Sequence, residues 1–168
     1  MKPLYLHQYR ALYSLSQGHD VILVAPCGSG KTRVLLNGVS AVARGMEYRG
    51  TVINGNPLGI VNIPLTSIME DKINHEKSFG MLTMSGKARL GADKEDSVKS
   101  TTSKPEHQFF DGTLSHICSH PEGFTTDLGK KILEKNESRI VLHASDELAN
   151  FMFAILYSLK LSFMALIL

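Results

Sequence analysis

The sequence predicts an α/β fold built on a doubly wound parallel sheet, and three observations lead to this prediction. Apolar runs of strand length alternate with segments of helical periodicity along most of the chain. A glycine-rich turn joins the first apolar run, residues 21–24, to a helix-like segment at 33–44. A later run, 139–145, ends in the acidic pair Asp146 and Glu147. In such a fold the ligand site lies at the carboxyl ends of the strands.

The elements follow from the spacing of the apolar residues. A short amphipathic helix is predicted at 7–17 and ends at Gly18, where the strand 21–24 follows. That strand is β-branched and apolar, which is typical of a buried parallel strand. The helix 33–44 comes next, and GMEYRG after it is predicted to be a turn. The later elements are a buried strand at 58–63, a helix at 65–73, a strand at 114–118, a helix at 126–135 and a strand at 139–145.

Two segments depart from this alternation. Residues from about 86 to 106 are rich in Lys, Ser, Thr, Asp and Gly, and are predicted to be an exposed, mobile insertion. Residues 151–168 are almost entirely apolar, and as a helix they would span about 27 Å, close to a bilayer core of ~30 Å. We interpret this tail as a truncated or misread terminus that partly supplies a helix and the next strand to the sheet. A membrane anchor is the alternative, and residues 1–150 form the expected domain.

Length and composition point to one intracellular domain. The chain has 168 residues, of which 43% are hydrophobic and 20% charged, enough for an ordinary core. A net charge of +2 does not by itself favour a nucleic-acid partner. Cys27 and Cys118 cannot make a zinc site alone and are expected to be reduced thiols. The N-terminus lacks the apolar run of a signal peptide.

Residues 25–32, APCGSGKT, have the pattern of a phosphate-binding loop, with Ala25 in place of the first glycine of the usual motif. The chemistry needs glycines where backbone N–H groups turn inward toward the phosphates. Lys31 would reach the β- and γ-phosphates, and the Thr32 hydroxyl would bind Mg²⁺. A helix whose N-terminus faces the anion follows. The candidate phosphate-binding residues are Gly28, Ser29, Gly30, Lys31 and Thr32.

The acidic pair at the end of the run 139–145 resembles a Walker B element. Asp146 would hold Mg²⁺ through water, and Glu147 would polarise the water that attacks the γ-phosphate. With the phosphate loop, this pair makes ATP and Mg²⁺ the expected ligands. Lys31 and Glu147 are then the candidate catalytic residues.

The two motifs together resemble those of superfamily 2 helicases, and three further stretches resemble the RecQ family in particular. Gln8 stands 23 residues before Lys31, in a segment that looks like the start of the RecQ motor domain. The stretch IPLTSIMEDKI, residues 63–73, is similar to that family's S-P-L-x-S-L-M-x-D-Q motif. SHPEGF, residues 119–124, resembles its Pro-Glu motif.

The resemblance implies a RecA-like ATP-binding lobe and assigns further roles. Gln8 would recognise adenine. Nucleic acid, DNA rather than RNA, would contact the region 119–124 and the three residues Pro64, Leu65 and Thr66. A nuclear location is implied by the family, and a membrane partner is not expected.

The sequence also departs from the family. The histidine of the family's D-E-x-H motif is replaced by Ala149, and the Phe-Arg pair before the adenine-binding glutamine is replaced by Leu4-Tyr5. The 168 residues contain neither the second motor lobe with its arginine finger nor the zinc-binding region. We therefore expect an ATP-binding lobe that is inactive as an isolated chain. A degenerate binding module without turnover and a small P-loop kinase remain the alternatives, although a kinase would need clustered arginines.

Overall fold

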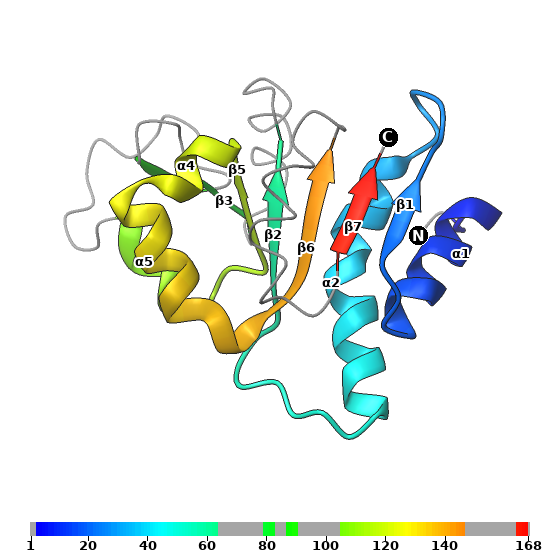
Figure 1. Ribbon diagram of the computed structural model, residues 1–168, viewed down its shortest axis with the longest axis horizontal. Coiled ribbons are helices and arrows are strands. Elements are labelled where there is room, and N and C mark those ends of the chain that lie inside the picture. The colour runs from blue at the N-terminus through cyan, green and yellow to red at the C-terminus, as the bar shows by residue number, and fades with distance from the viewer. Residues whose placement is uncertain (1–2, 64–78, 83–86, 91–104, 147–163, 168) are drawn as a thin grey trace.

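Seven strands form one sheet in the order β1-β7-β6-β2-β5-β3-β4. The computed structural model describes residues 3–63, 79–82, 87–90, 105–146 and 164–167 (Figure 1). The strands are β1 (Val21–Leu23), β2 (Leu58–Asn62), β3 (Phe79–Leu82), β4 (Ala88–Leu90), β5 (His116–Ser119), β6 (Ile140–Asp146) and β7 (Met164–Ile167). The helices are α1 (Leu6–Ser16), α2 (Lys31–Tyr48), α4 (Pro121–Thr125) and α5 (Asp127–Asn136), with short 3-10 turns at Pro105–Phe109 and Glu137–Arg139.

Every neighbouring pair of strands is parallel except β3 and β4, which are antiparallel. The carboxyl ends of the parallel strands therefore meet along one edge of the sheet, where the arrowheads of β1, β7, β6 and β2 point in Figure 1. This edge positions the candidate site.

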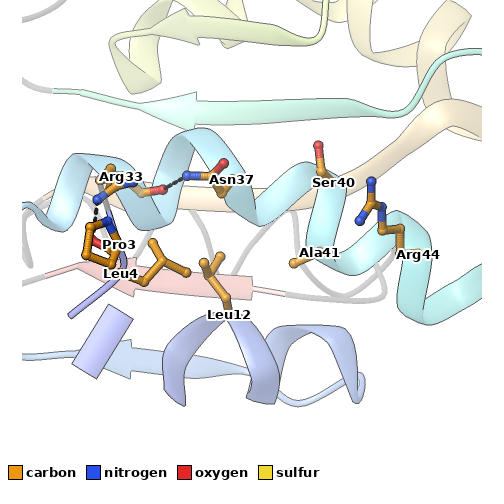
Figure 2. Close-up of a pocket in the computed structure, with 8 residues that line it drawn as sticks. All are labelled: Pro3, Leu4, Leu12, Arg33, Asn37, Ser40, Ala41 and Arg44. Atoms are coloured by element: carbon orange, nitrogen blue, oxygen red, sulfur yellow. Dashed lines mark hydrogen bonds between the residues drawn. The ribbon is translucent and has the colours of Figure 1, made fainter. Parts of the chain in front are cut away.

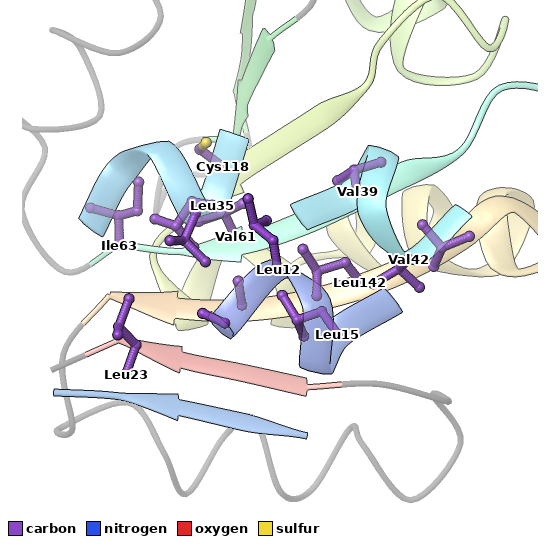
Figure 3. Packing of buried hydrophobic residues seen from close by; sticks show 14 of the residues in the cluster. Leu12, Leu15, Leu23, Leu35, Val39, Val42, Val61, Ile63, Cys118 and Leu142 are labelled. Atoms are coloured by element: carbon purple, nitrogen blue, oxygen red, sulfur yellow. The ribbon is translucent and has the colours of Figure 1, made fainter. Parts of the chain in front are cut away.

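The sheet carries a hydrophobic core on each face. On one face, α1 and α2 pack against alternate strand residues such as Val61 and Leu142 (Figure 3). On the other face, Phe124 of α4 and Ile132 of α5 pack against Ile60 and its neighbours. Successive residues of a strand point to opposite faces, which is why β2 is buried along its whole length. Helices on both faces of a largely parallel sheet confirm the predicted doubly wound α/β fold.

Helix α2 is longer than the sequence predicts. It continues to Tyr48, so the prediction of a turn from Gly45 is wrong for its first four residues. At Gly45 α2 lies against the end of α1, and a β-carbon at this position would clash with the carbonyl oxygen of Ser16. The glycine thus serves close helix packing, and the chain turns only after Arg49, at Gly50 with its φ of 81°.

Strand β1 is not the buried strand that its apolar sequence predicts. Within the described part of the chain its only partner is β7, and the side chains of Ile22 and Val24 are 61% and 74% exposed. The apolar composition of β1 predicted a strand correctly. Burial of a strand depends on its position in the sheet, which cannot be predicted from its composition.

The remaining differences concern short segments. The sequence does not predict strand β3. Strand β4 lies inside the range predicted to be an insertion, and its residues 88–90 pair with β3. The tail supplies β7, which lies between β1 and β6. The predicted helix 65–73 and residues 91–104 of the insertion lie outside the described residues.

Candidate nucleotide-binding site

The phosphate loop, residues 25–32, connects β1 to the first turn of α2. Gly28 and Gly30 have φ angles of 77° and 79°, a conformation that L side chains rarely adopt. A β-carbon at Gly28 would meet nothing within 4 Å, so space beside the loop is open. The Oγ of Ser29 is buried without a hydrogen-bond partner. These features fit a loop whose backbone and hydroxyl groups are arranged for a phosphate ligand.

Lys31 is the first residue of α2, and its Nζ donates a hydrogen bond to the carbonyl of Ala25 at 2.6 Å. The ammonium group therefore lies across the loop, from the helix N-terminus to the first loop residue. Thr32 follows in the same helical turn. The helix N-terminus also carries partial positive charge, so lysine and helix both favour an anion here.

Gln8 lies against the phosphate loop and is fully buried. Its Nε2 donates to the carbonyl oxygens of Ser29 at 3.2 Å and Gly30 at 3.0 Å. Its Oε1 accepts from the backbone N–H of Tyr5 at 2.9 Å. These partners fix the orientation of the amide, because carbonyls only accept and the N–H only donates. The structure thus gives Gln8 a contact with the loop, while recognition of adenine stays a prediction.

Asp146 ends β6 at the level of the phosphate loop. It lies opposite Ile167 of β7, and Ile167 lies opposite Leu23 of β1, two residues before the loop begins. Adjacent strands are about 4.8 Å apart, so the backbones of Asp146 and Leu23 are separated by about 10 Å across the sheet. Mg²⁺ binds hydroxyl and carboxylate oxygens together with phosphates. Thr32 and Asp146 come from the elements that flank such a position, and Glu147 lies outside the described residues.

The predicted nucleic-acid segments leave the neighbouring strands of the same edge. β2 and β5 are adjacent, with Asn62 opposite Ser119. Residues 64–66 continue from β2 and lie outside the described part of the chain, whereas 119–124 are described. In that segment Pro121, Gly123 and Phe124 of α4 are buried, Phe124 as part of the hydrophobic core, and Glu122 is exposed. Much of SHPEGF therefore packs the domain, which leaves His120 and Glu122 nearer the surface.

A groove of about 620 Å³ lies beside α2 (Figure 2). Arg33 forms one end of it, and its Nη1 donates to the carbonyl of Pro3 at 2.9 Å. Because Arg33 follows Thr32 directly, this groove adjoins the phosphate site. Its lining combines apolar and polar side chains from the N-terminal segment, α1 and α2: Pro3, Leu4, Leu12, Arg33, Asn37, Ser40, Ala41 and Arg44.

Two buried histidines within the sheet were not predicted. His143 of β6 and Asn62 of β2 are hydrogen-bonded at 2.9 Å, and burial lowers the pKa of His143 to about 4. His116 of β5 stacks on Phe79 with ring centroids 4.4 Å apart. Burial lowers the pKa of His116 to about 4, opposed by the backbone of Leu35. Both rings are therefore neutral at pH 7, and the spacing of histidines along the sequence contained no sign of this.

In this domain a phosphate loop joins the first strand to the second helix, and an acidic residue lies on a strand two places away in the sheet. This arrangement defines the class of P-loop nucleotide-binding α/β domains. The family model for DEAD/DEAH box helicases matches residues 5–156. The chain belongs to the DEAD/DEAH box helicase family, and its domain is the ATP-binding N-terminal lobe of a superfamily 2 helicase, a class that binds nucleic acid. No curated protein matches the chain.

The membrane question concerns the apolar tail. No helix in the described ranges is long and apolar enough to cross a bilayer. Residues 164–167 of the tail form β7 of the sheet.

Proposed function

We propose that this chain is the ATP-binding lobe of a RecQ-like DNA helicase. The observation that carries the proposal is the order of features along one edge of the sheet. The phosphate loop follows β1, Asp146 ends β6, and the segments that resemble RecQ nucleic-acid motifs follow β2 and β5. Nucleotide and nucleic acid would thus bind at neighbouring positions of one rigid sheet. The resemblance of residues 63–73 and 119–124 to RecQ motifs favours DNA over RNA.

Each site residue has a role in this proposal. Lys31 neutralises charge on the β- and γ-phosphates, and loop N–H groups contact the phosphate oxygens. Thr32 and Asp146 would hold Mg²⁺, which supplies further positive charge to the triphosphate. Glu147 would orient the attacking water. Pro64, Leu65 and Thr66 would contact the nucleic-acid backbone.

The base would lie on the side of the loop where Gln8 and the N-terminal segment meet. The Oε1 of Gln8 accepts only from Tyr5, so one lone pair is left to accept a hydrogen bond from the base. Both Nε2 hydrogens are used by Ser29 and Gly30, so Gln8 can donate to the base only by giving up one of these two hydrogen bonds. The groove beside Arg33 offers apolar surface next to the phosphate site.

Calorimetric titration with Mg–ATP tests the phosphate site. We expect Lys31→Ala to abolish ATP binding, because a charge-assisted hydrogen bond and a full positive charge are lost together. Lys130→Ala is the matched control, since Lys130 is exposed on α5 at the other face of the sheet, and should bind as the unaltered chain does. Equal ATP affinity in Lys31→Ala and Lys130→Ala would refute the nucleotide site.

The second part of the proposal is that the 168-residue chain binds ATP without DNA-stimulated turnover. An arginine that stabilises the transition state contributes about 10³–10⁵ in rate in related enzymes. Tight binding of the substrate alone gives no acceleration. Ala149 also lacks the side chain that, in the RecQ resemblance, links ATP state to DNA. A degenerate binding module is favoured by these same departures.

Steady-state phosphate release, with and without single-stranded DNA, distinguishes a motor from a binding module. We expect release near background in both conditions, and no change in Glu147→Gln. Release that DNA raises several-fold and that Glu147→Gln removes would show that the chain is a complete motor.

A further inference from the structure

The carbonyl of Ser29 in the phosphate loop accepts two side-chain hydrogen bonds from α1. The Nε2 of His7 lies 3.1 Å from this oxygen, and the Nε2 of Gln8 lies 3.2 Å from it. A carbonyl oxygen has two lone pairs, so both are used. Because this oxygen can only accept, the His7 ring must carry a hydrogen on Nε2. The tautomer of His7 is therefore set by the loop.

This arrangement fixes a peptide plane that matters for phosphate binding. In a planar trans peptide, the C=O of Ser29 and the N–H of Gly30 point in opposite directions. Holding the carbonyl toward α1 therefore directs the Gly30 N–H away from α1. Backbone N–H groups of this loop are the donors that cradle phosphates. Gly30 is also confined, since a β-carbon there would lie 2.5 Å from the Nε2 of Gln8.

The imidazole of His7 is itself held in place. It stacks on the ring of Tyr5, with centroids 5.8 Å apart and planes 13° apart. Its helix, α1, is anchored on α2 through the close approach at Gly45. The half-buried ring thus connects a firmly packed helix to a loop of glycine-rich backbone.

We propose that His7 is a positioning residue of the phosphate loop, which orients the Ser29–Gly30 peptide so that its N–H faces the triphosphate. The inference rests on the proposed nucleotide site and assigns to that site a residue beyond the phosphate-loop motif. His7 acts through the loop and touches no ligand itself. A histidine that only packed α1 would not need a donor at Nε2.

Two substitutions of similar shape separate the donor from the packing. His7→Gln keeps an N–H donor near the position of Nε2, and His7→Met fills similar space without a donor. Both remove the imidazole ring that stacks on Tyr5, so the two variants are compared for the N–H donor that only His7→Gln keeps. His19→Met, an exposed position just after α1, controls for histidine loss in general.

The measurement is the affinity for inorganic triphosphate with Mg²⁺, which contains no base and so excludes effects on adenine recognition. We expect His7→Gln and His19→Met to bind within about twofold of the unaltered chain, and His7→Met to bind about 3- to 10-fold more weakly, as expected for one hydrogen bond. Thermal unfolding of each variant verifies that the protein measured is folded.

The outcomes are distinct. If His7→Gln and His7→Met both bind triphosphate as tightly as the unaltered chain does, the role of His7 is overturned and the nucleotide site stays intact. Failure of the unaltered chain to bind either triphosphate or ATP would overturn the proposed function, and this inference with it. Weak binding by both variants, with similar unfolding temperatures, would assign the effect to the Tyr5 stacking and refute the hydrogen bond as the cause.

Discussion

Arg139 is a buried arginine that connects three segments at the amino end of the sheet. Its guanidinium donates to the carbonyls of Asn56 at 2.8 Å and Leu114 at 2.6 Å, and to the Oδ1 of Asn136 at 3.1 Å. These acceptors come from the segment before β2, the segment before β5 and the end of α5. Loss of the guanidinium would leave two buried acceptors, the Leu114 carbonyl and the Asn136 Oδ1, without this partner, and each such group costs about 1–3 kcal/mol.

We therefore expect Arg139→Ala to lower the free energy of unfolding by about 3 kcal/mol or more. Urea denaturation measures this change. Arg44→Ala, on the exposed side of α2, is the matched control and should change stability by less than about 0.5 kcal/mol. A loss of less than about 1 kcal/mol in Arg139→Ala would show that water replaces these hydrogen bonds without difficulty.

Gln8 allows a residue-scale test of base recognition. Because its amide holds the carbonyls of Ser29 and Gly30, Gln8→Ala should weaken both inorganic triphosphate and ATP. If Gln8 also reads adenine, ATP affinity should fall further than triphosphate affinity, by about 3- to 10-fold for one hydrogen bond. Parallel titrations with the two ligands give this ratio. Equal losses would mean that Gln8 acts through the loop alone.

At the scale of elements, the contact between α1 and α2 determines where the loop-holding side chains of α1 lie. A β-carbon at Gly45 would meet the Ser16 backbone, which cannot move without shifting α1. At Gly38, in the same helix, a β-carbon would meet only the Leu142 side chain at 2.8 Å and the Leu15 side chain at 3.6 Å. Alanine is favoured over glycine in a helix by about 1 kcal/mol at both positions, so that contribution cancels in a comparison.

Gly45→Ala should therefore destabilise the protein by about 1–3 kcal/mol more than Gly38→Ala, since the backbone at Ser16 cannot move aside as the end of the Leu142 side chain can. It should also weaken Mg–triphosphate binding, because α1 carries His7 and Gln8. Thermal unfolding and triphosphate titration of the two variants provide the comparison. The same stability in both would show that α1 shifts without cost.

The elements also show what a sequence contains and what it lacks. The phosphate loop was predictable because its glycines, Lys31 and Thr32 lie together in eight residues. His7 was not, because its contact with Ser29 spans 22 residues and depends on how α1 crosses α2. The sequence around Gly45 predicted a turn because glycine is common both in turns and where two helices approach closely, and the sequence alone does not distinguish these two uses. Strand β3, four residues long, lacks the length over which periodicity can be recognised.

At the scale of the whole molecule, the sheet contains two histidines that must remain neutral. His116 lies between β5 and α2, against Phe79, and its Nδ1 is hydrogen-bonded with the Ser115 hydroxyl at 2.9 Å. His143 faces Asn62 on the opposite side of the sheet. Burial lowers both pKa values from the ordinary 6.5 to about 4. Protonation of either ring would place a charge in one of the two cores, so acid should weaken both layers together.

The sign of the pH dependence follows from proton binding. Between pH 6.5 and about 4 the unfolded chain binds protons at His116 and His143 that the folded protein does not. The contribution of these two histidines to the free energy of unfolding is therefore fully present above pH 6.5 and decreases as the pH falls toward 4. Below pH 4 their contribution does not decrease further. A shift of this size corresponds to about 3 kcal/mol for each histidine. Stability of a typical domain is about 5–15 kcal/mol, so the pair could account for much of it.

Urea midpoints at pH 7, 6 and 5 measure this dependence, in a range above the ordinary pKa values of carboxylates. The slope of unfolding free energy against pH is proportional to the number of protons that the chain takes up on unfolding. We expect His116→Gln and His143→Gln each to reduce that number by about one near pH 5. His19→Gln is the matched control for replacing a histidine, because His19 is exposed and lies in neither core, so the slopes of the two core variants are compared with its slope. An unaltered slope in both buried variants would mean that acid opens the protein at another site, before either core is protonated.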